Sequence, residues 1–149
     1  MRRVLPLLLL GLLLPYSPPA YSADRATPEE AKAMAVKAAE YLRTAGPEKA
    51  FAEFTAKDSE WHDRDLYVSV EDAKSVLVAH GANPVLVGRS MIDLKDVDGN
   101  SISGQIQQVK DTGWIHYKWQ NPVTKAVEPK TAFEVRVGEY VVGVGAYVK

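Results

Sequence analysis

The chain has 149 residues, 18 of them lysine or arginine and 19 aspartate or glutamate, and its length suits one domain with a single core. With 46% hydrophobic and 25% charged residues its composition is that of an ordinary globular protein, and the net charge of -1 gives none of the basic surplus typical of nucleic-acid binding. The absence of cysteine excludes disulfides, cysteine-ligated zinc or iron–sulfur centres, covalent haem attachment, a cysteine nucleophile and an N-terminal lipid anchor.

The N-terminus predicts a secretory signal peptide over residues 1–22. A positively charged start precedes a leucine-rich apolar run at 4–14, and small residues then mark a cleavage site. We expect cleavage after Ser22, with cleavage after Ala23 as the alternative. The apolar run is about half the roughly 20 residues that a membrane-spanning helix needs, and no later segment is longer. The expected product is therefore an exported domain, residues 23–149, periplasmic or secreted, with no membrane span after cleavage.

Two helices are predicted at the start of this domain. Thr27 is a helix cap and Pro28 suits the first turn, after which apolar residues recur at helical spacing until Gly46. The stripe of this first helix is rich in alanine. Pro47 begins a second, shorter helix. Its expected buried face consists of Ala50, Phe51 and Phe54.

The remaining chain predicts strands rather than helices, with turn residues between them. A short helix or turn is expected in 85–94, a turn at 96–100, a helix at 101–110 and a polar loop at 121–129. The expected strands are 65–70 and 75–79, which form a hairpin, then 114–119, 131–137 and 140–148. Strands and helices do not alternate, so the pattern does not favour a doubly wound nucleotide-binding fold. The pattern predicts an α+β domain in which helices pack on a five-stranded antiparallel sheet.

Three stretches of the strand region, in this order and spacing, are similar to a known family. The first, 65–88, has a strand–turn–strand run that ends in His80; the second, 113–122, reads Gly-Trp…Tyr-x-Trp; the third, 130–147, ends in Gly-x-Gly-x-Tyr. They resemble the Cache domain, the PAS-like extracellular sensor module of bacterial receptors, in its small single-domain form. The resemblance covers about residues 29–148. It implies a small-molecule pocket between the sheet and its overlying helix and loops, often for short carboxylates.

The sequence also departs from the family pattern. Gln120 replaces the usual proline, Thr131 the usual serine and Phe133 the usual tyrosine. Members of the family usually continue into a membrane helix and a signalling module, whereas this sequence ends at Lys149. We therefore expect a free-standing exported form that binds its ligand and relays the bound state to a membrane sensor or transporter.

The resemblance implies a set of ligand-binding residues. The matching positions are Tyr67, His80, Tyr117, Trp119 and Lys130. Phenol and imidazole groups can donate hydrogen bonds, and a lysine can supply charge, so this chemistry suits a small anion. Strand alternation places Tyr117 and Trp119 on one face with Ile115, and His116 on the other.

Each of these residues also has a structural interpretation. The tyrosines and Trp119 can be core aromatics, His80 can stabilise the glycine turn that follows it, and Lys130 can protect a strand edge. Two strand glycines, Gly143 and Gly145, indicate close approach of either a helix or a ligand to one face of the last strand.

The sequence contains no motif for metal binding, nucleophilic catalysis or phosphate binding. An EF-hand calcium loop beginning at Asp96 would need glycine and glutamate where Ser101 and Gln107 stand. The three histidines lack metal-ligand spacing, there is no Gly-x-Ser-x-Gly elbow, and no phosphate-binding loop is present. We expect no enzyme, metal or cofactor. The alternative to a ligand-binding module is a structural or interaction protein, whose alanine-rich first helix mediates docking or formation of a homodimer.

Overall fold

The computed structural model describes residues 25–148, so the predicted signal peptide lies outside the described residues. Both N-terminal helices are present as predicted: α1 (Pro28–Ala45) and α2 (Pro47–Thr55). The hydroxyl of Thr27 accepts a hydrogen bond from the backbone N–H of Glu30, and the Glu30 carboxylate accepts one from the N–H of Thr27. This reciprocal capping satisfies two N–H groups that the first turn leaves free. Gly46 separates the helices with a φ of +83°, a value that glycine adopts without strain.

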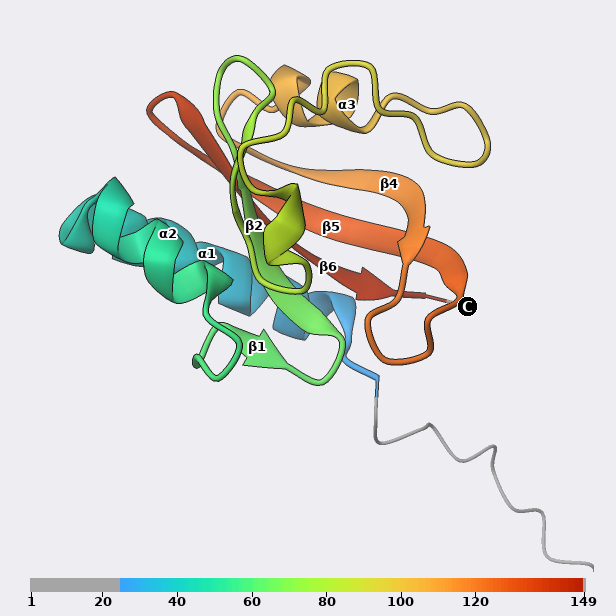
Figure 1. The fold of residues 1–149 in the computed structure, drawn as a ribbon, viewed down its shortest axis with the longest axis horizontal. Helices are drawn as coiled ribbons and strands as arrows, with labels where there is room; N and C mark the ends of the chain where they lie inside the picture. Colours follow the sequence, from blue (N-terminus) through green and yellow to red (C-terminus); the bar gives the residue numbers. More distant parts are fainter. Residues whose placement is uncertain (1–24, 149) are drawn as a thin grey trace, which may run out of the picture.

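The rest of the domain is an antiparallel sheet with two short helices (Figure 1). The strands are β1 (His62–Asp63), β2 (Leu66–Glu71), β3 (Leu77–His80), β4 (Thr112–Gln120), β5 (Val127–Val137) and β6 (Tyr140–Tyr147), with η1 (Pro84–Leu86) and α3 (Ile102–Gln108) before β4. The order is β1-β2-β6-β5-β4, and β3 also pairs with β2. All five predicted strands and the predicted hairpin are confirmed. The two-residue β1 is a sixth strand, which is too short to show any periodicity in the sequence.

Strand boundaries differ most at the predicted loop 121–129. Pro129 suggested a loop, but it lies opposite Lys118 in the ladder between β4 and β5, which continues to the pair Gln120 and Val127. The turn is therefore confined to residues 121–126. The buried Asn121 holds it, because its side-chain oxygen accepts from the N–H of Val123 at 2.8 Å.

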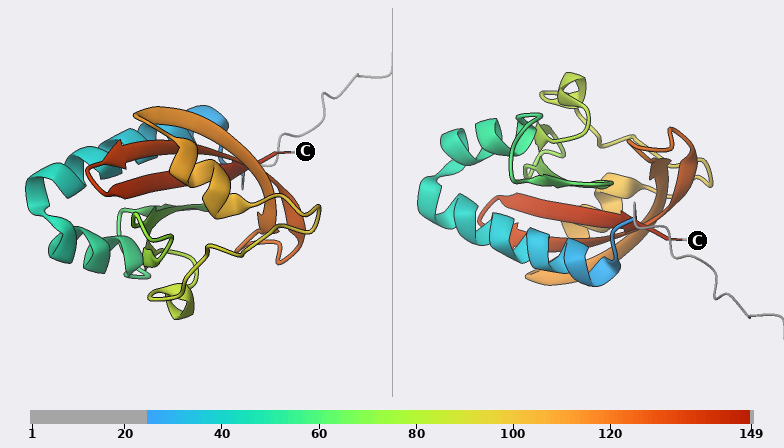
Figure 2. Two further views of the ribbon diagram at one scale, coloured as in Figure 1. Left: turned by 90° about the horizontal axis from the view of Figure 1, so that it is seen from above. Right: turned by 90° about the horizontal axis from the view of Figure 1, so that it is seen from below.

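Helix α1 covers one face of the sheet, along β5 and β6 (Figure 2). Its buried alanines, Ala31, Ala35 and Ala38, belong to the main core together with Val142 and Val144 of β6. Small alanine side chains let the helix lie close to the sheet. The alanine stripe that suggested docking or a dimer interface is thus occupied within the chain.

The opposite face is covered by α3 and by the loop that precedes it. This segment also covers the outer edge of β4: the N–H of His116 donates to Gln105 Oε1 at 3.2 Å, and the N–H of Lys118 donates to Asp96 Oδ2 at 3.0 Å. An exposed strand edge would invite pairing with another chain, and these side chains occupy it. Within residues 25–148, no helix combines the length and apolar character needed to cross a membrane.

Candidate functional site

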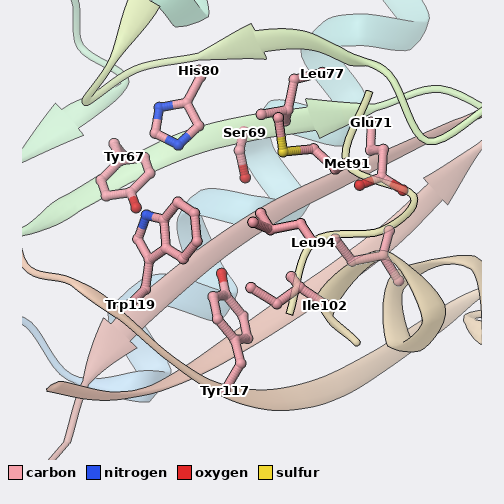
Figure 3. Close-up of a pocket in the computed structure, with 11 residues that line it drawn as sticks. Tyr67, Ser69, Glu71, Leu77, His80, Met91, Leu94, Ile102, Tyr117 and Trp119 are labelled. Atoms are coloured by element: carbon pink, nitrogen blue, oxygen red, sulfur yellow. The ribbon is translucent and has the colours of Figure 1, made fainter. Parts of the chain in front are cut away.

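A cavity of about 40 Å³ lies between the sheet and the segment that contains α3 (Figure 3). Its polar wall comes from the strands and consists of Tyr67, Ser69, Glu71, His80, Tyr117 and Trp119. Its apolar wall is formed by Leu77, Met91, Leu94, Ile102 and Ile106. At roughly 10–15 Å³ of such volume per water molecule, the cavity has room for about three waters, which is close to the size of a two- or three-carbon acid.

Four of the five predicted site residues line this cavity. Tyr67 projects from β2, His80 from β3, and Tyr117 and Trp119 from β4. The predicted alternation of β4 is confirmed, because Tyr117 and Trp119 share the cavity face while His116 is exposed. The fifth, Lys130, does not line the cavity. It is 3% exposed and lies behind Tyr67, whose hydroxyl oxygen accepts a hydrogen bond from its Nζ at 2.8 Å.

A chain of hydrogen bonds runs from Lys130 through two tyrosines. Lys130 Nζ can only donate, so the Tyr67 oxygen accepts from it. Tyr147 Oη donates its one proton to the carbonyl of Gln120 at 2.7 Å, which leaves the proton of Tyr67 for the contact of 3.3 Å between the two hydroxyls. That contact is long for a hydrogen bond between hydroxyls. Tyr67 therefore has a proton that a stronger acceptor in the cavity can take.

The Lys130 ammonium is a buried charge without an acidic partner among residues 25–148. Aromatic rings surround it instead: Nζ lies 4.0 Å from the ring centroid of Tyr67, 4.9 Å from that of Tyr147 and 5.9 Å from that of Tyr117. Ring faces attract cations and stabilise the charge in part. The positive potential reaches the cavity through Tyr67.

His80 combines both predicted interpretations. Its Nδ1 accepts from the N–H of Asn83 at 2.9 Å, which stabilises the turn, and its ring lines the cavity beside Tyr67, with 4.9 Å between ring centroids. Burial, together with the nearby charge of Lys130, lowers the pKa of His80 to about 3, so the imidazole is neutral at physiological pH. Because Nδ1 is the acceptor, this network assigns the proton to Nε2, which is a donor.

Three further donors border the cavity. The side-chain N–H or O–H groups of Ser69, Tyr117 and Trp119 make no hydrogen bond with any other group of the described chain. Together with Tyr67 and His80 they form a wall of donors facing a small space. Such a wall can bind an anion without a metal or cofactor.

The two strand glycines lie on the cavity face of β6, opposite to the face that packs on α1. The close approach that these glycines predicted is made by side chains of β5, not by a helix. The Lys130 side chain occupies the space above Gly145, and the Glu134 carboxylate occupies the space above Gly143, both from β5. Glu134 is buried, and burial raises its pKa to about 8, with Glu71 acting in the same direction and Lys130 against it.

Sequence reasoning missed Ser69 and Glu71, although both follow Tyr67 at the two-residue period of β2. Glu71 is buried and accepts hydrogen bonds from Ser103 Oγ and Gln107 Nε2, both at 2.7 Å. These bonds attach α3 to the sheet at the end of the cavity. Ser103 and Gln107 lie more than thirty residues after Glu71 in the sequence, so only the fold brings the three side chains together.

The structure combines an α+β, PAS-like fold with a small cavity between the sheet and the segment that contains α3. The family described as Single Cache domain 2 matches residues 20–149. The chain therefore belongs to the single Cache domain 2 family, as the sequence resemblance predicted.

Known proteins agree with this assignment. The methyl-accepting chemotaxis protein McpP of Pseudomonas putida is 25% identical over 92 residues, which are 58% of this chain and only 17% of that receptor. A methyl-accepting chemotaxis protein from Vibrio parahaemolyticus has a similar structure, with a TM-score of 0.68 and 20% identity over 81% of this chain and 88% of that one. A Cache chemosensory domain described for carboxylic acid recognition gives a TM-score of 0.62 with 21% identity over 81% of this chain and 88% of the other.

Proposed function

We propose that this chain is an exported sensor domain that binds a short carboxylate in the cavity and relays the bound state to a membrane sensor or transporter. The observation that carries this proposal is the buried Lys130 ammonium, which has no acidic partner among residues 25–148 and is hydrogen-bonded to the cavity hydroxyl of Tyr67. A bound carboxylate would compensate that charge and accept the proton that Tyr67 shares weakly with Tyr147.

The rest of the cavity supports an acid with a short apolar part. Donors on Ser69, His80 and Tyr117 face the space from the strands, while Leu94 and Ile102 close it from the other side. Ligand sites commonly combine an apolar lining with a few placed polar groups. The small volume favours two or three carbons over larger acids inside the cavity. Recognition of a carboxylic acid by a structurally similar Cache domain is in line with this chemistry.

The proposed relay involves α3. Ile102 and Ile106 of this helix line the cavity, and Glu71 ties the same helix to β2. A ligand that contacts both parts stabilises the arrangement in which they are close, and it can shift an equilibrium only by its difference in affinity for the two states. The apolar run at 4–14 supports the proposed export to the periplasm.

Calorimetric titration and thermal shift test the binding. Residues 23–149, unfolded and refolded to remove any bound metabolite, are screened against short carboxylates, amino acids, amines and purines. At about 100 times its dissociation constant, a ligand adds about 2.7 kcal/mol to the free energy of unfolding. We expect short carboxylates to raise the melting temperature and the other classes to leave it unchanged.

Single variants then test whether Tyr117 and Lys130 contribute to carboxylate binding. Tyr117→Phe removes one donor and should weaken carboxylate binding about tenfold, the effect of losing a hydrogen bond to a charged group. Lys130→Met removes the buried charge behind Tyr67 and should also weaken carboxylate binding. Tyr140→Phe, at the far end of β6, is the matched control and should bind as the wild type does. Equal affinity of all three variants would show that Tyr117 and Lys130 do not contribute to binding, and no response to any carboxylate would overturn the proposed ligand class.

A further inference from the structure

A second hollow of about 440 Å³ lies directly outside the cavity. Tyr67, His80 and Trp119 line both spaces, so the two share a wall. We call the second hollow the outer groove. Its volume falls within the range of roughly 300–1,000 Å³ that is usual for small-molecule sites, whereas the cavity alone is far below that range.

Lysines dominate the charges of the outer groove. Lys95, Lys118 and Lys125 line it, and Asp96 is its one acidic lining residue within the described chain. Lys118 pairs with Asp98 at 2.9 Å. Lys95 and Lys125 form no ion pair with any residue of the described range, so two positive charges remain for a ligand.

The Asp96 carboxylate is ionised and offsets one of the three lysine charges of the outer groove, and hydrogen-bond donors of the chain compensate part of its own charge. It accepts hydrogen bonds from the N–H groups of Asp98, Asn100 and Lys118 and from the Asn100 side-chain amide, at 2.9–3.0 Å. These donors lower the pKa of Asp96 to about 2, with Asn100 as the largest cause. Its oxygens are thus directed at the loop that they hold together.

Part of the lining of the outer groove is apolar. Leu86, Val97, Pro122 and Val127 provide it, and Val97 and Val127 are 70% and 52% exposed. A groove whose lining combines a donor wall, apolar side chains and lysine ammonium groups fits a short hydrocarbon chain with an acidic group at each end.

We propose that the outer groove is the second compartment of the ligand site, and that the natural ligand is a dicarboxylate of four or five carbons. One carboxylate lies at the shared wall of Tyr67, His80 and Trp119, and the other lies between Lys95 and Lys125. This inference rests on the proposed function, because it requires that the shared wall binds a carboxylate. It makes the two lysines the residues that distinguish dicarboxylates from monocarboxylates.

Calorimetric titration at low ionic strength tests the proposal with matched acids: propionate and butyrate, and succinate and glutarate. We expect wild-type protein to bind the dicarboxylates more tightly than the monocarboxylates. The double variant Lys95→Gln/Lys125→Gln should weaken dicarboxylate binding about tenfold, as expected for two partly exposed ion pairs, and leave monocarboxylate binding unchanged. Lys49→Gln/Lys57→Gln, at and just after α2, removes the same charge elsewhere and serves as the control.

The outcomes separate the two proposals. Binding of propionate without any advantage for succinate or glutarate would overturn the second compartment and leave the proposed function intact. An equal loss for both acid classes in the Lys95/Lys125 variant would also overturn it, since the lysines would then act only as a general positive field. Failure of all four acids to bind would overturn both proposals.

Discussion

At the scale of single residues, one strand places two buried ionisable groups, one basic and one acidic, on the cavity face of the sheet. Lys130 and Glu134 both project from β5 over the glycines of β6 and are each 3% exposed. Lys130 has tyrosine partners, whereas the Glu134 side chain makes no hydrogen bond with residues 25–148. Burial disfavours the ionised carboxylate, which raises the pKa of Glu134 to about 8.

This raised pKa predicts how stability depends on pH. Between the ordinary pKa of about 4.5 and the folded value of about 8, the folded protein holds a proton on Glu134 that the unfolded chain releases. The free energy of unfolding therefore falls as pH rises through this window, by up to about 1.4 kcal/mol per pH unit. Glu134→Gln should remove that fall. The measurement is urea unfolding at several pH values, with Glu48→Gln on the surface of α2 as control.

His80 also changes stability with pH, so it determines in which pH range the effect of Glu134 is seen alone. Its pKa is lowered to about 3 from 6.5, so the unfolded chain binds the extra proton and stability rises with pH between those values. The two effects oppose each other between about pH 4.5 and 6.5, and only that of Glu134 remains from there to pH 8. If wild type and Glu134→Gln lose stability in parallel over pH 6.5–8, Glu134 is not protonated in the folded state.

The candidate site residues followed from the family resemblance, and strand alternation added only the face of β4. Tyr117 and Trp119 lie on one face as predicted, because alternation is a local property of the backbone. The depth of Lys130 was not predictable, because a face contains both residues that reach the cavity and residues that lie behind them. Glu71 needed its partners from α3 to be recognised as a structural group of the site.

At the scale of elements, features set by consecutive residues were predictable, whereas features set by pairing with distant segments were not. The caps and spacing of α1 lie within consecutive residues, and the helix begins and ends as predicted. Strand β5 begins four residues before the predicted start, because its length follows from pairing with β4 rather than from its own composition. The two-residue β1 exists only through its pairing with Leu66 and Tyr67 of β2.

Strand β6 gives a prediction about the glycine pair. A methyl group on Gly145 would collide with Cε of Lys130, so Gly145→Ala should overpack the cavity face and cost about 1–3 kcal/mol of stability. In a Lys130→Ala background the colliding atom is gone, and the same change should cost much less. Chemical unfolding of the two single variants and the double variant measures this coupling. Additive losses would show that Gly145 serves β6 in some way other than making room for Lys130.

At the scale of the whole molecule, the two faces of the sheet are held by different forces. On the α1 face, helix alanines and strand valines form the extended apolar core. On the other face the apolar cluster is small, centred on Val109, Ile115 and Ala132, and polar groups contribute much of the attachment of α3. Beside the bonds to Glu71, Arg136 donates to the carbonyls of Val109 and Gln107 at 2.7 and 3.2 Å.

This asymmetry predicts where the domain opens. Local opening requires less free energy where fewer apolar contacts are lost, so amides of α3 should exchange hydrogen faster than those in the middle of α1. Glu71→Ala removes the acceptor for Ser103 and Gln107 and should accelerate exchange in α3 further while leaving α1 unchanged. Hydrogen exchange followed by mass spectrometry measures both.

The difference in hydrogen exchange between α3 and α1 also tests how a ligand acts on the domain. A carboxylate in the cavity contacts β2 and α3 together, so it should slow exchange in α3 more than in α1 if α3 opens in its absence. Tyr140→Phe provides a variant in which this ligand effect should persist. Equal protection of α3 and α1 without ligand would mean that α3 is already fixed, and binding would then have no population of open states to shift.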